Sequence, residues 1–235
     1  MNNIYIIAEL CGQWGGSVTR AKKMINQCAQ NGADAVKVQL YDTYRMPGEN
    51  REKWEYLSMQ KEQLKNLKKY ADSLNIDFFA SAFHEDRVEW MLNENIKINK
   101  IASLILDKNW ENGKDLVSKY LDKFDKTFIS LGKWEEEDFP FENENIIYFH
   151  CLAKYPHNLD EAIERLPKKF ENPIIGYSDH SIGIDACLEA IKRGAKYIEK
   201  HFTTDHSLNS ETEAAHLCSM DYNELATLRR EAGKI

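Results

Sequence analysis

Two histidines near the end of the chain have the spacing of metal ligands. His180 comes two residues after Ser178, and His201 comes two residues after Glu199. Side chains two residues apart on a strand point the same way, and neighbouring parallel strands lie about 4.8 Å apart. If both segments are strand ends, one wall of a cleft presents a serine, a glutamate and two imidazoles. Two imidazoles suit a divalent ion whose other positions belong to water and substrate, although hydrogen-bonded structural histidines would show the same spacing.

Lysines and serines occur at the ends of other predicted strands. Lys37 shares a strand face with Gln39, and Lys100 lies at a strand end. A buried lysine is costly unless it pairs with an anion, and lysines with small hydroxyl donors suit a phosphate or a carboxylate. Each residue alone would also fit a solvent-exposed lysine or a helix-capping serine, but their convergence favours an anion site. The serines are Ser81, Ser103, Ser130 and Ser178.

Two glutamates stand in segments that are otherwise apolar. Glu9 ends the first predicted strand, and Glu199 lies inside the last one. A buried carboxylate needs a cation or a proton. Beside a metal ion and lysines, such carboxylates could position or deprotonate a water molecule. The alternative is a structural ion pair with a neighbouring lysine.

Eight short apolar runs alternate with amphipathic stretches along the chain. Thr19–Asn31, Lys61–Leu74 and Asp185–Arg193 repeat apolar residues with a period near 3.6, which is typical of helices. The apolar runs have the length and composition of buried strands. These runs are Ile4–Glu9, Ala35–Leu40, Phe78–Ala82, Lys100–Ser103, Thr127–Leu131, Ile146–Cys151, Ile174–Ser178 and Tyr197–Phe202.

This alternation predicts an α/β fold, a compact (β/α)8 TIM barrel, with an open doubly wound sheet as the alternative. Closure is favoured because polar residues lie at the carboxyl ends of nearly every strand, and a barrel gathers those ends around one mouth. Trp134–Asn145 is acidic and contains Pro140, so the fifth helix is expected to be short or missing. Since no proline- or glycine-rich linker divides the chain, residues 1–235 are expected to form a single domain.

The composition indicates the cellular compartment and excludes some classes of binding partner. A net charge of −7 disfavours nucleic acid and anionic membranes as partners, and no apolar run approaches the ~18 residues of a membrane-spanning helix. The five cysteines are scattered and lack a Cys-x-x-Cys pair, which fits reduced thiols. We therefore expect a cytoplasmic protein.

Two motifs are specific enough to indicate a family. Gly176–Gly183 reads Gly-Tyr-Ser-Asp-His-Ser-Ile-Gly, and Glu199–Thr203 reads Glu-Lys-His-Phe-Thr. Together with segments that match in order along the chain, they resemble the sialic acid synthase family, N-acetylneuraminate synthase and its relatives. The fold of that family, a (β/α)8 barrel, agrees with the strand count. The other matching segments are Ile7–Glu9, Gly32–Gln39, Lys100–Ser103, His150–Cys151 and Tyr155–Pro156.

The resemblance implies a condensation reaction. Phosphoenolpyruvate joins the aldehyde of an open-chain sugar and gives a 3-deoxy-2-keto acid and phosphate. The resemblance also implies a divalent ion, usually manganese, with magnesium or cobalt as alternatives, held by His180 and His201. The phosphoenolpyruvate contacts carry over onto Lys37, Ser81, Lys100, Ser103, Ser130 and Ser178.

The same resemblance assigns roles to the acids and to two further polar residues. Glu9 and Glu199 match family glutamates near the metal and the reacting carbons, and are the expected catalytic residues. We expect Gln39, and Tyr155 after the sixth strand, to contact the acceptor aldehyde.

The sequence departs from the family mainly on the sugar side. Trp14, Ile105, Leu152 and Ala153 replace polar family residues, and Lys154 could pair with an anion on the acceptor. After the last strand, Glu213-Ala214-Ala215 is the nearest match to a family Gly-Pro-Asp. The family's C-terminal antifreeze-like domain is also expected to be missing. We therefore predict an acceptor other than N-acetylmannosamine.

Two other functions stay open at this point. A metal-dependent lyase or isomerase would keep the ion but would leave Lys37 and Lys100 without a task. A non-catalytic barrel could act as a binding or regulatory partner of a synthase, against which the retained histidines and glutamates argue. Family dimers are swapped through the domain that is expected to be missing, so the family's oligomeric state does not carry over to this chain. A homo-oligomer that packs barrel against barrel through its outer helices stays open.

Overall fold

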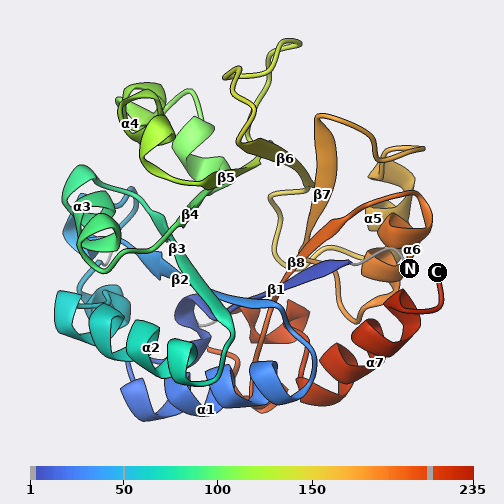
Figure 1. The fold of residues 1–235 in the computed structure, drawn as a ribbon, viewed down its shortest axis with the longest axis horizontal. Coiled ribbons are helices and arrows are strands. Elements are labelled where there is room, and N and C mark those ends of the chain that lie inside the picture. The colour runs from blue at the N-terminus through green and yellow to red at the C-terminus, as the bar shows by residue number, and fades with distance from the viewer. Residues whose placement is uncertain (1–3, 50, 211–213) are drawn as a thin grey trace.

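The computed structural model describes residues 4–49, 51–210 and 214–235, and their strands close into a parallel barrel (Figure 1). The strands pair in sequence order, and β1 pairs with both β2 and β8. This confirms the predicted (β/α)8 barrel. The strands are β1 Tyr5–Glu9, β2 Ala35–Leu40, β3 Asp77–Ala82, β4 Ile98–Ile101, β5 Lys126–Ser130, β6 Ile146–Cys151, β7 Ile174–Asp179 and β8 Tyr197–His201.

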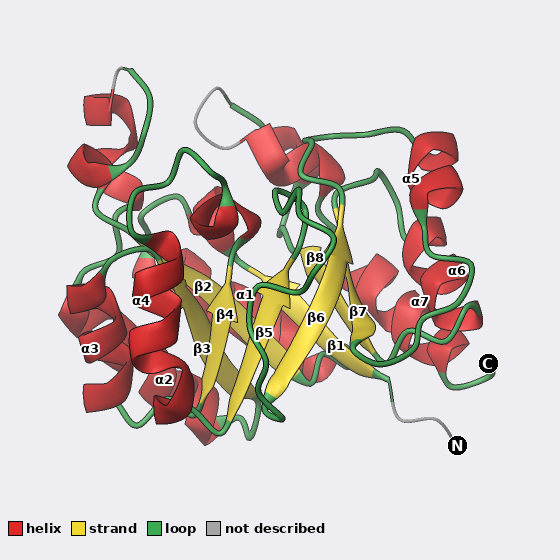
Figure 2. Cartoon of the chain, turned by 90° about the horizontal axis from the view of Figure 1, so that it is seen from above, coloured by secondary structure: helices red, strands yellow, loops and turns green. Residues whose placement is uncertain are grey.

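Seven α-helices formed by the described residues pack outside the barrel, and Figure 2 shows that loops, not helices, cross in front of β5 and β6. The three helices predicted from periodicity are present, and each end lies within one residue of its predicted position. The helices are α1 Val18–Gln30, α2 Lys61–Ser73, α3 Glu85–Asn93, α4 Gly113–Tyr120, α5 Leu159–Arg165, α6 Asp185–Lys192 and α7 Tyr222–Ala232. None of these helices is long and apolar enough to cross a membrane, within the parts of the chain that were described.

The segment between β5 and β6 is a loop, and the described residues there contain no α-helix. This confirms the prediction that the helix after the fifth strand is short or missing; the helix labelled α5 follows β6. The acidic run and Pro140 between β5 and β6 explain the loop, because proline removes a backbone donor and like charges repel along a helix. The strand that contains Lys100 is the one that differs most from its prediction. It runs from Ile98 to Ile101, because Ser103–Leu106 turns into a 3-10 helix.

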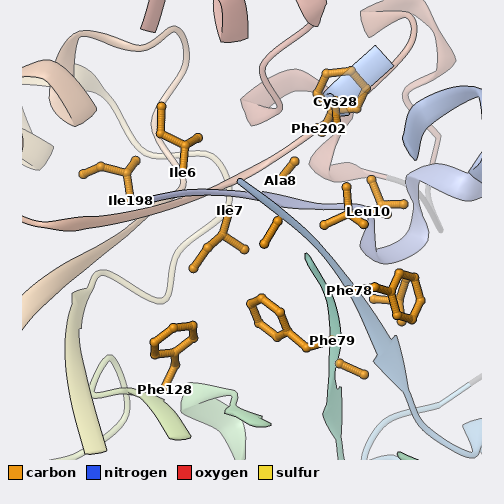
Figure 3. Close-up of a cluster of buried hydrophobic side chains, with 14 of the residues drawn as sticks. Ile6, Ile7, Ala8, Leu10, Cys28, Phe78, Phe79, Phe128, Ile198 and Phe202 are labelled. Carbon is orange, nitrogen blue, oxygen red and sulfur yellow. The ribbon is translucent and has the colours of Figure 1, made fainter. Parts of the chain in front are cut away.

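The lower half of the barrel interior is filled by apolar side chains. Ile7, Phe79 and Phe128 point toward one another between the strands (Figure 3). The Phe128 ring centroid lies 5.6 Å from that of Phe79 and 5.3 Å from those of Phe149 and Tyr197. Because side chains alternate along a strand, the residues two positions further along β1, β3 and β5 also point inward, toward the mouth. Those residues are Glu9, Ser81 and Ser130.

Candidate active site

A cavity of about 450 Å³ opens at the carboxyl ends of the strands. It brings together the residues predicted as catalytic groups, as phosphoenolpyruvate or acceptor contacts and as metal ligands, with the exception of Ser81, which contacts Lys37. Lys37 and Lys100 are buried in its wall, each with only 2% of its surface exposed. The predicted residues that line the cavity are Glu9, Lys37, Gln39, Lys100, Ser103, Ser130, Tyr155, Ser178, His180, Glu199 and His201.

The Lys37 amine lies among oxygen atoms from three strands. It forms an ion pair with Glu9 and donates a hydrogen bond to Ser81 Oγ at 3.1 Å. Its Nζ is 3.8 Å from Glu199 Oε1. Burial lowers the pKa of Lys37 to about 7. The amine is therefore held at a fixed place and titrates near neutral pH.

Both buried lysine amines lie close to the Glu199 carboxylate. Its Oε1 lies 3.6 Å from Lys100 Nζ and accepts a hydrogen bond from Ser178 Oγ at 3.1 Å. Burial raises the pKa of the Glu199 carboxyl, but Lys100 and Lys37 outweigh burial and hold that pKa below its usual value. The other carboxylate oxygen, Oε2, is buried and has no hydrogen-bond partner within the described residues. An unpaired buried oxygen at a cavity wall is a place for a ligand or water.

Contacts with Ser130 and Phe149 inside the barrel hold the Lys100 side chain in place. Its amine donates to Ser130 Oγ at 2.7 Å and lies 5.6 Å from the Phe149 ring centroid. Ser103 Oγ is held on the same side because it accepts a hydrogen bond from the Gly132 backbone N–H at 3.2 Å. A cation flanked by hydroxyl groups in a desolvated cavity is suited to an oxyanion.

The two histidines are oriented as metal ligands usually are. Their ring centroids are 5.5 Å apart. Nδ1 of His180 lies 2.9 Å from the Leu152 carbonyl oxygen, and Nδ1 of His201 lies 2.9 Å from Gln13 Oε1. Each Nδ1 therefore carries the proton and donates it, which leaves Nε2 with a free lone pair.

This donor set fits a divalent metal ion. Burial lowers the pKa of His180 to about 4 and that of His201 well below its usual value, so both rings are neutral at physiological pH. Neutral imidazoles whose second nitrogen is hydrogen-bonded to an oxygen are the usual metal-binding form. Among the described residues, no group of three or more His, Cys, Asp and Glu side chains is arranged to hold an ion. The remaining positions would belong to water and substrate.

Tyr155 and Gln39, the two predicted acceptor contacts, both line the cavity. The Tyr155 ring centroid is 3.9 Å from that of His180 and 5.8 Å from that of His201. Tyr155 is 53% exposed, so it covers the histidines from the solvent side. Gln39 follows Lys37 on the inward face of β2 and lines the cavity.

A buried ion pair lies behind the two histidines. Asp179 and Lys200 are paired in register on β7 and β8, and their carboxylate and amine form an ion pair. Lys200 also donates to the Ser181 carbonyl oxygen at 2.7 Å, and Asp179 accepts from the Tyr177 hydroxyl at 2.8 Å. Burial raises the pKa of Asp179, but Lys200 and the hydrogen bonds hold it below its usual value. The pair fixes the two strands that carry the histidines.

Replacing Lys200 with methionine should lower the free energy of unfolding by roughly 3–5 kcal/mol, because it leaves the Asp179 carboxylate buried without its cation. The double variant Asp179→Asn/Lys200→Met removes both charges and keeps an amide oxygen for Tyr177 and Ser181. It should therefore be more stable than Lys200→Met alone. Urea denaturation measures both values, and a double variant that is no more stable than Lys200→Met would contradict this account.

Most of the residues that differ from the family pattern on the sugar side lie outside the cavity. Trp14 is buried in the hydrophobic core, and Ile105 is buried in a second apolar cluster. Leu152 reaches the site only through its backbone carbonyl, and Lys154 forms a 2.8 Å ion pair with Glu161 at the surface. Of the four replacements predicted to make the acceptor pocket less polar, only Ala153 lines the cavity. The expectation was wrong for Trp14, Ile105 and Leu152, and Lys154 is already paired.

Several cavity residues were not predicted from the sequence. Trp54 lines the cavity from the 3-10 helix Arg51–Leu57. Lys133 and Ala215 reach it from the loops after β5 and β8. Ala215 belongs to the segment matched to Gly-Pro-Asp, of which Glu213 lies outside the described residues. No periodicity marks such loop residues, so only a motif could have indicated them.

Comparisons with known proteins identify the family to which this chain is related. Residues 24–235 match the NeuB family. The chain is 30% identical to N,N'-diacetyllegionaminic acid synthase of Legionella pneumophila, over 95% of this chain and 70% of that protein. It is 29% identical to N-acetylneuraminate-9-phosphate synthase of Drosophila melanogaster, over 97% of this chain and 67% of that protein. The crystal structure of N-acetylneuraminic acid synthetase from Leptospira borgpetersenii with citrate superposes with a TM-score of 0.85, at 31% identity, over 99% of this chain and 84% of that one.

Proposed function

Because the chain belongs to the NeuB family of phosphoenolpyruvate-dependent condensing synthases, we propose that residues 1–235 act as one synthase domain that joins phosphoenolpyruvate to an aldose. The products are a 3-deoxy-2-keto acid and phosphate. The observation that carries the proposal is the sharing of Glu199 by two buried lysines beside two neutral imidazoles. A lyase or isomerase without an anionic cosubstrate would have no use for the lysines.

The two lysines and their serine partners would hold phosphoenolpyruvate. Phosphoenolpyruvate is highly anionic, and a desolvated anion needs fixed cations and donors. Lys37 and Lys100 would supply the charges, and both amines lie near Glu199 Oε1, at 3.8 and 3.6 Å. Ser81 and Ser130 fix the two amines, while Ser103 and Ser178 add hydroxyl groups at the cavity wall.

His180 and His201 would hold the divalent ion, for which manganese is our first choice. When bound, such an ion polarises an aldehyde oxygen as a Lewis acid. Gln13 and the Leu152 carbonyl fix the ring orientations through Nδ1. Tyr155 shields this side of the cavity from solvent.

The two glutamates would act on the reacting carbons. As carbon 3 of phosphoenolpyruvate attacks the aldehyde, positive charge develops at carbon 2, where water then adds. The buried carboxylates of Glu9 and Glu199 favour that charge and can accept a proton from the water. Glu9 Oε1 is held by the Cys11 backbone N–H at 2.7 Å, so its direction is fixed before substrate enters.

We propose an acceptor other than N-acetylmannosamine. Ala153 and Ala215 line the cavity at places where the sialic acid synthase motifs have polar residues. A site that loses polar partners for a polyol loses affinity for it, because the remaining hydroxyl groups are buried unpaired. Gln39 is then the main amide that faces the acceptor.

The test is an assay of phosphate release with manganese, phosphoenolpyruvate and a panel of aldoses, followed by mass spectrometry of the products. We expect an aldose other than N-acetylmannosamine to give a product with the mass gain of a condensed pyruvate. Release with N-acetylmannosamine alone would overturn the acceptor proposal. If calorimetry detects binding of neither manganese nor phosphoenolpyruvate, the synthase proposal itself fails.

Phosphoenolpyruvate binding should be coupled to proton uptake by Lys37. Burial lowers the pKa of Lys37 to about 7, with Glu199 opposing it. The bound anion would favour the charged amine and raise that pKa. At pH 8 binding should therefore take up close to one proton, and affinity should fall as the pH rises above about 7. Calorimetry in two buffers of different ionisation enthalpy measures the uptake, and Lys37→Met should lack it. Binding of phosphoenolpyruvate at pH 8 without proton uptake by the unmodified protein would contradict this expectation.

A further inference from the structure

A second and larger cavity, of about 1040 Å³, lies beside the candidate active site. The two cavities share Met46, Phe83 and Leu104 in their walls. The two cavities therefore adjoin at these three side chains, which is where an extended ligand would pass from one cavity to the other. Its volume is at the upper limit of about 1,000 Å³ that is usual for small-molecule sites. We refer to it as the outer groove.

The charges of the outer groove disfavour an anionic ligand. Its walls carry three cations, Arg45, Arg51 and Lys119, and four carboxylates, Glu85, Asp107, Glu111 and Asp115. Two of the cations are already in ion pairs, Arg45 with Asp86 and Lys119 with Glu85. A phosphate or a carboxylate would thus meet more acids than unengaged cations. A neutral ligand rich in both donors and acceptors fits better.

The floor of the outer groove is aromatic. The Trp110 ring centroid lies 5.8 Å from that of Phe83 and 6.2 Å from that of His84. His84 Nδ1 is buried and has no hydrogen-bond partner within the described residues. Flat aromatic rings beside planar polar side chains bind ligands that have both an apolar face and a polar rim.

The polar groups of the outer groove are held in fixed positions. Arg51 donates to the Gly48 and Tyr44 carbonyl oxygens at 2.8 and 2.7 Å. Asp107 Oδ1 accepts from both the backbone and the side-chain N–H of Asn109 at 2.9 Å. Such planar groups can pair with neighbouring hydroxyl groups without a large loss of side-chain entropy.

We propose that the outer groove binds a neutral glycosyl group carried by the acceptor, with its ring on Trp110. The acceptor is then a disaccharide or another glycosylated aldose whose reducing end provides the aldehyde at the metal side. This inference rests on the proposed function, since the groove extends the acceptor site. It also explains how an acceptor could bind when the inner wall offers it two alanines.

The experiment compares reducing disaccharides with the monosaccharide of the same reducing residue, for example cellobiose with glucose and N,N'-diacetylchitobiose with N-acetylglucosamine. At least one disaccharide should show a kcat/KM for phosphate release at least about tenfold above its monosaccharide, which corresponds to about 1.4 kcal/mol from the contacts of the second ring. Trp110→Ala should remove this preference. Trp134→Ala is the matched control, since Trp134 lies in the neighbouring loop outside the groove, and it should keep the preference.

Equal kcat/KM values for every disaccharide and monosaccharide pair, or a preference that survives Trp110→Ala, would overturn the inference. A preference for a phosphorylated monosaccharide would overturn the assignment of a neutral ligand. Calorimetry with the disaccharide alditols, which lack an aldehyde, separates the groove from the chemistry. If no aldose releases phosphate, the proposed function fails, whereas alditol binding that is lost in Trp110→Ala would still support the groove.

Discussion

Replacing His201 with alanine is expected to abolish tight manganese binding and to lower metal-dependent phosphate release by about 10³-fold. Only His180 would then be left as an imidazole ligand at the mouth. Lewis-acid activation contributes several kcal/mol to such reactions, and each ~1.4 kcal/mol is a factor of ten in rate. Fold stability should change much less, because the ring lines a cavity and is not part of the core. Calorimetric titration with manganese, and electron paramagnetic resonance of the bound ion, measure the loss without any need for activity.

Two further variants test whether the loss of manganese binding is specific to His201. Gln13→Leu removes the oxygen that orients His201 and should weaken manganese binding by a smaller factor of about 10–100. His206→Ala changes a histidine in the loop after β8 that does not line the cavity, and it should leave manganese affinity unaltered. Manganese affinity that is equal in His201→Ala and the unmodified protein would remove these histidines from the metal site.

The alternation of side chains along strands is the reason that so much of the site could be predicted. Ser178 and Glu199 lie on strands, and their inward direction follows from burial and parity. The same argument extends to His180 and His201 because each lies at, or one residue beyond, a strand end. Lys37 was predicted for a related reason, since an inward lysine in an apolar strand is costly unless an anion pairs with it.

The same argument fails in the loops, where no fixed period relates sequence to direction. Trp14 ends the short 3-10 helix Cys11–Trp14, and its ring turns into the core instead of the mouth. The Ile105 side chain, in the 3-10 helix after β4, likewise packs into an apolar cluster and not into the mouth. Trp54 was not predicted for the same reason, because it reaches the cavity from a 3-10 helix in a loop. Loop positions need three-dimensional contacts, and most residues of the outer groove lie in loops and short 3-10 helices, with the others on α3 and α4.

The second large effect is expected for Glu199→Gln, which should separate binding from catalysis. Glu199 Oε1 lies 3.8 Å from Lys37 Nζ and 3.6 Å from Lys100 Nζ, so it neutralises part of the charge that would hold phosphoenolpyruvate. The amide removes that negative charge with little change in shape. Phosphoenolpyruvate should therefore bind at least as tightly as before. The kcat should fall by about 10²–10⁴, the usual contribution of a positioned acid or base.

Measurement of phosphoenolpyruvate affinity by calorimetry, together with kcat for phosphate release, distinguishes a catalytic role from a structural one. Ser178→Ala is the matched control, because it removes the 3.1 Å hydrogen bond to Glu199 but keeps the carboxylate. It should lower kcat far less than Glu199→Gln. A structural ion pair predicts the reverse pattern, in which Glu199→Gln loses stability and phosphoenolpyruvate affinity while the kcat of the folded fraction is kept. That pattern would exclude Glu199 from the chemistry, because a carboxylate that only balances two lysines has no part in stabilising charge on the substrate.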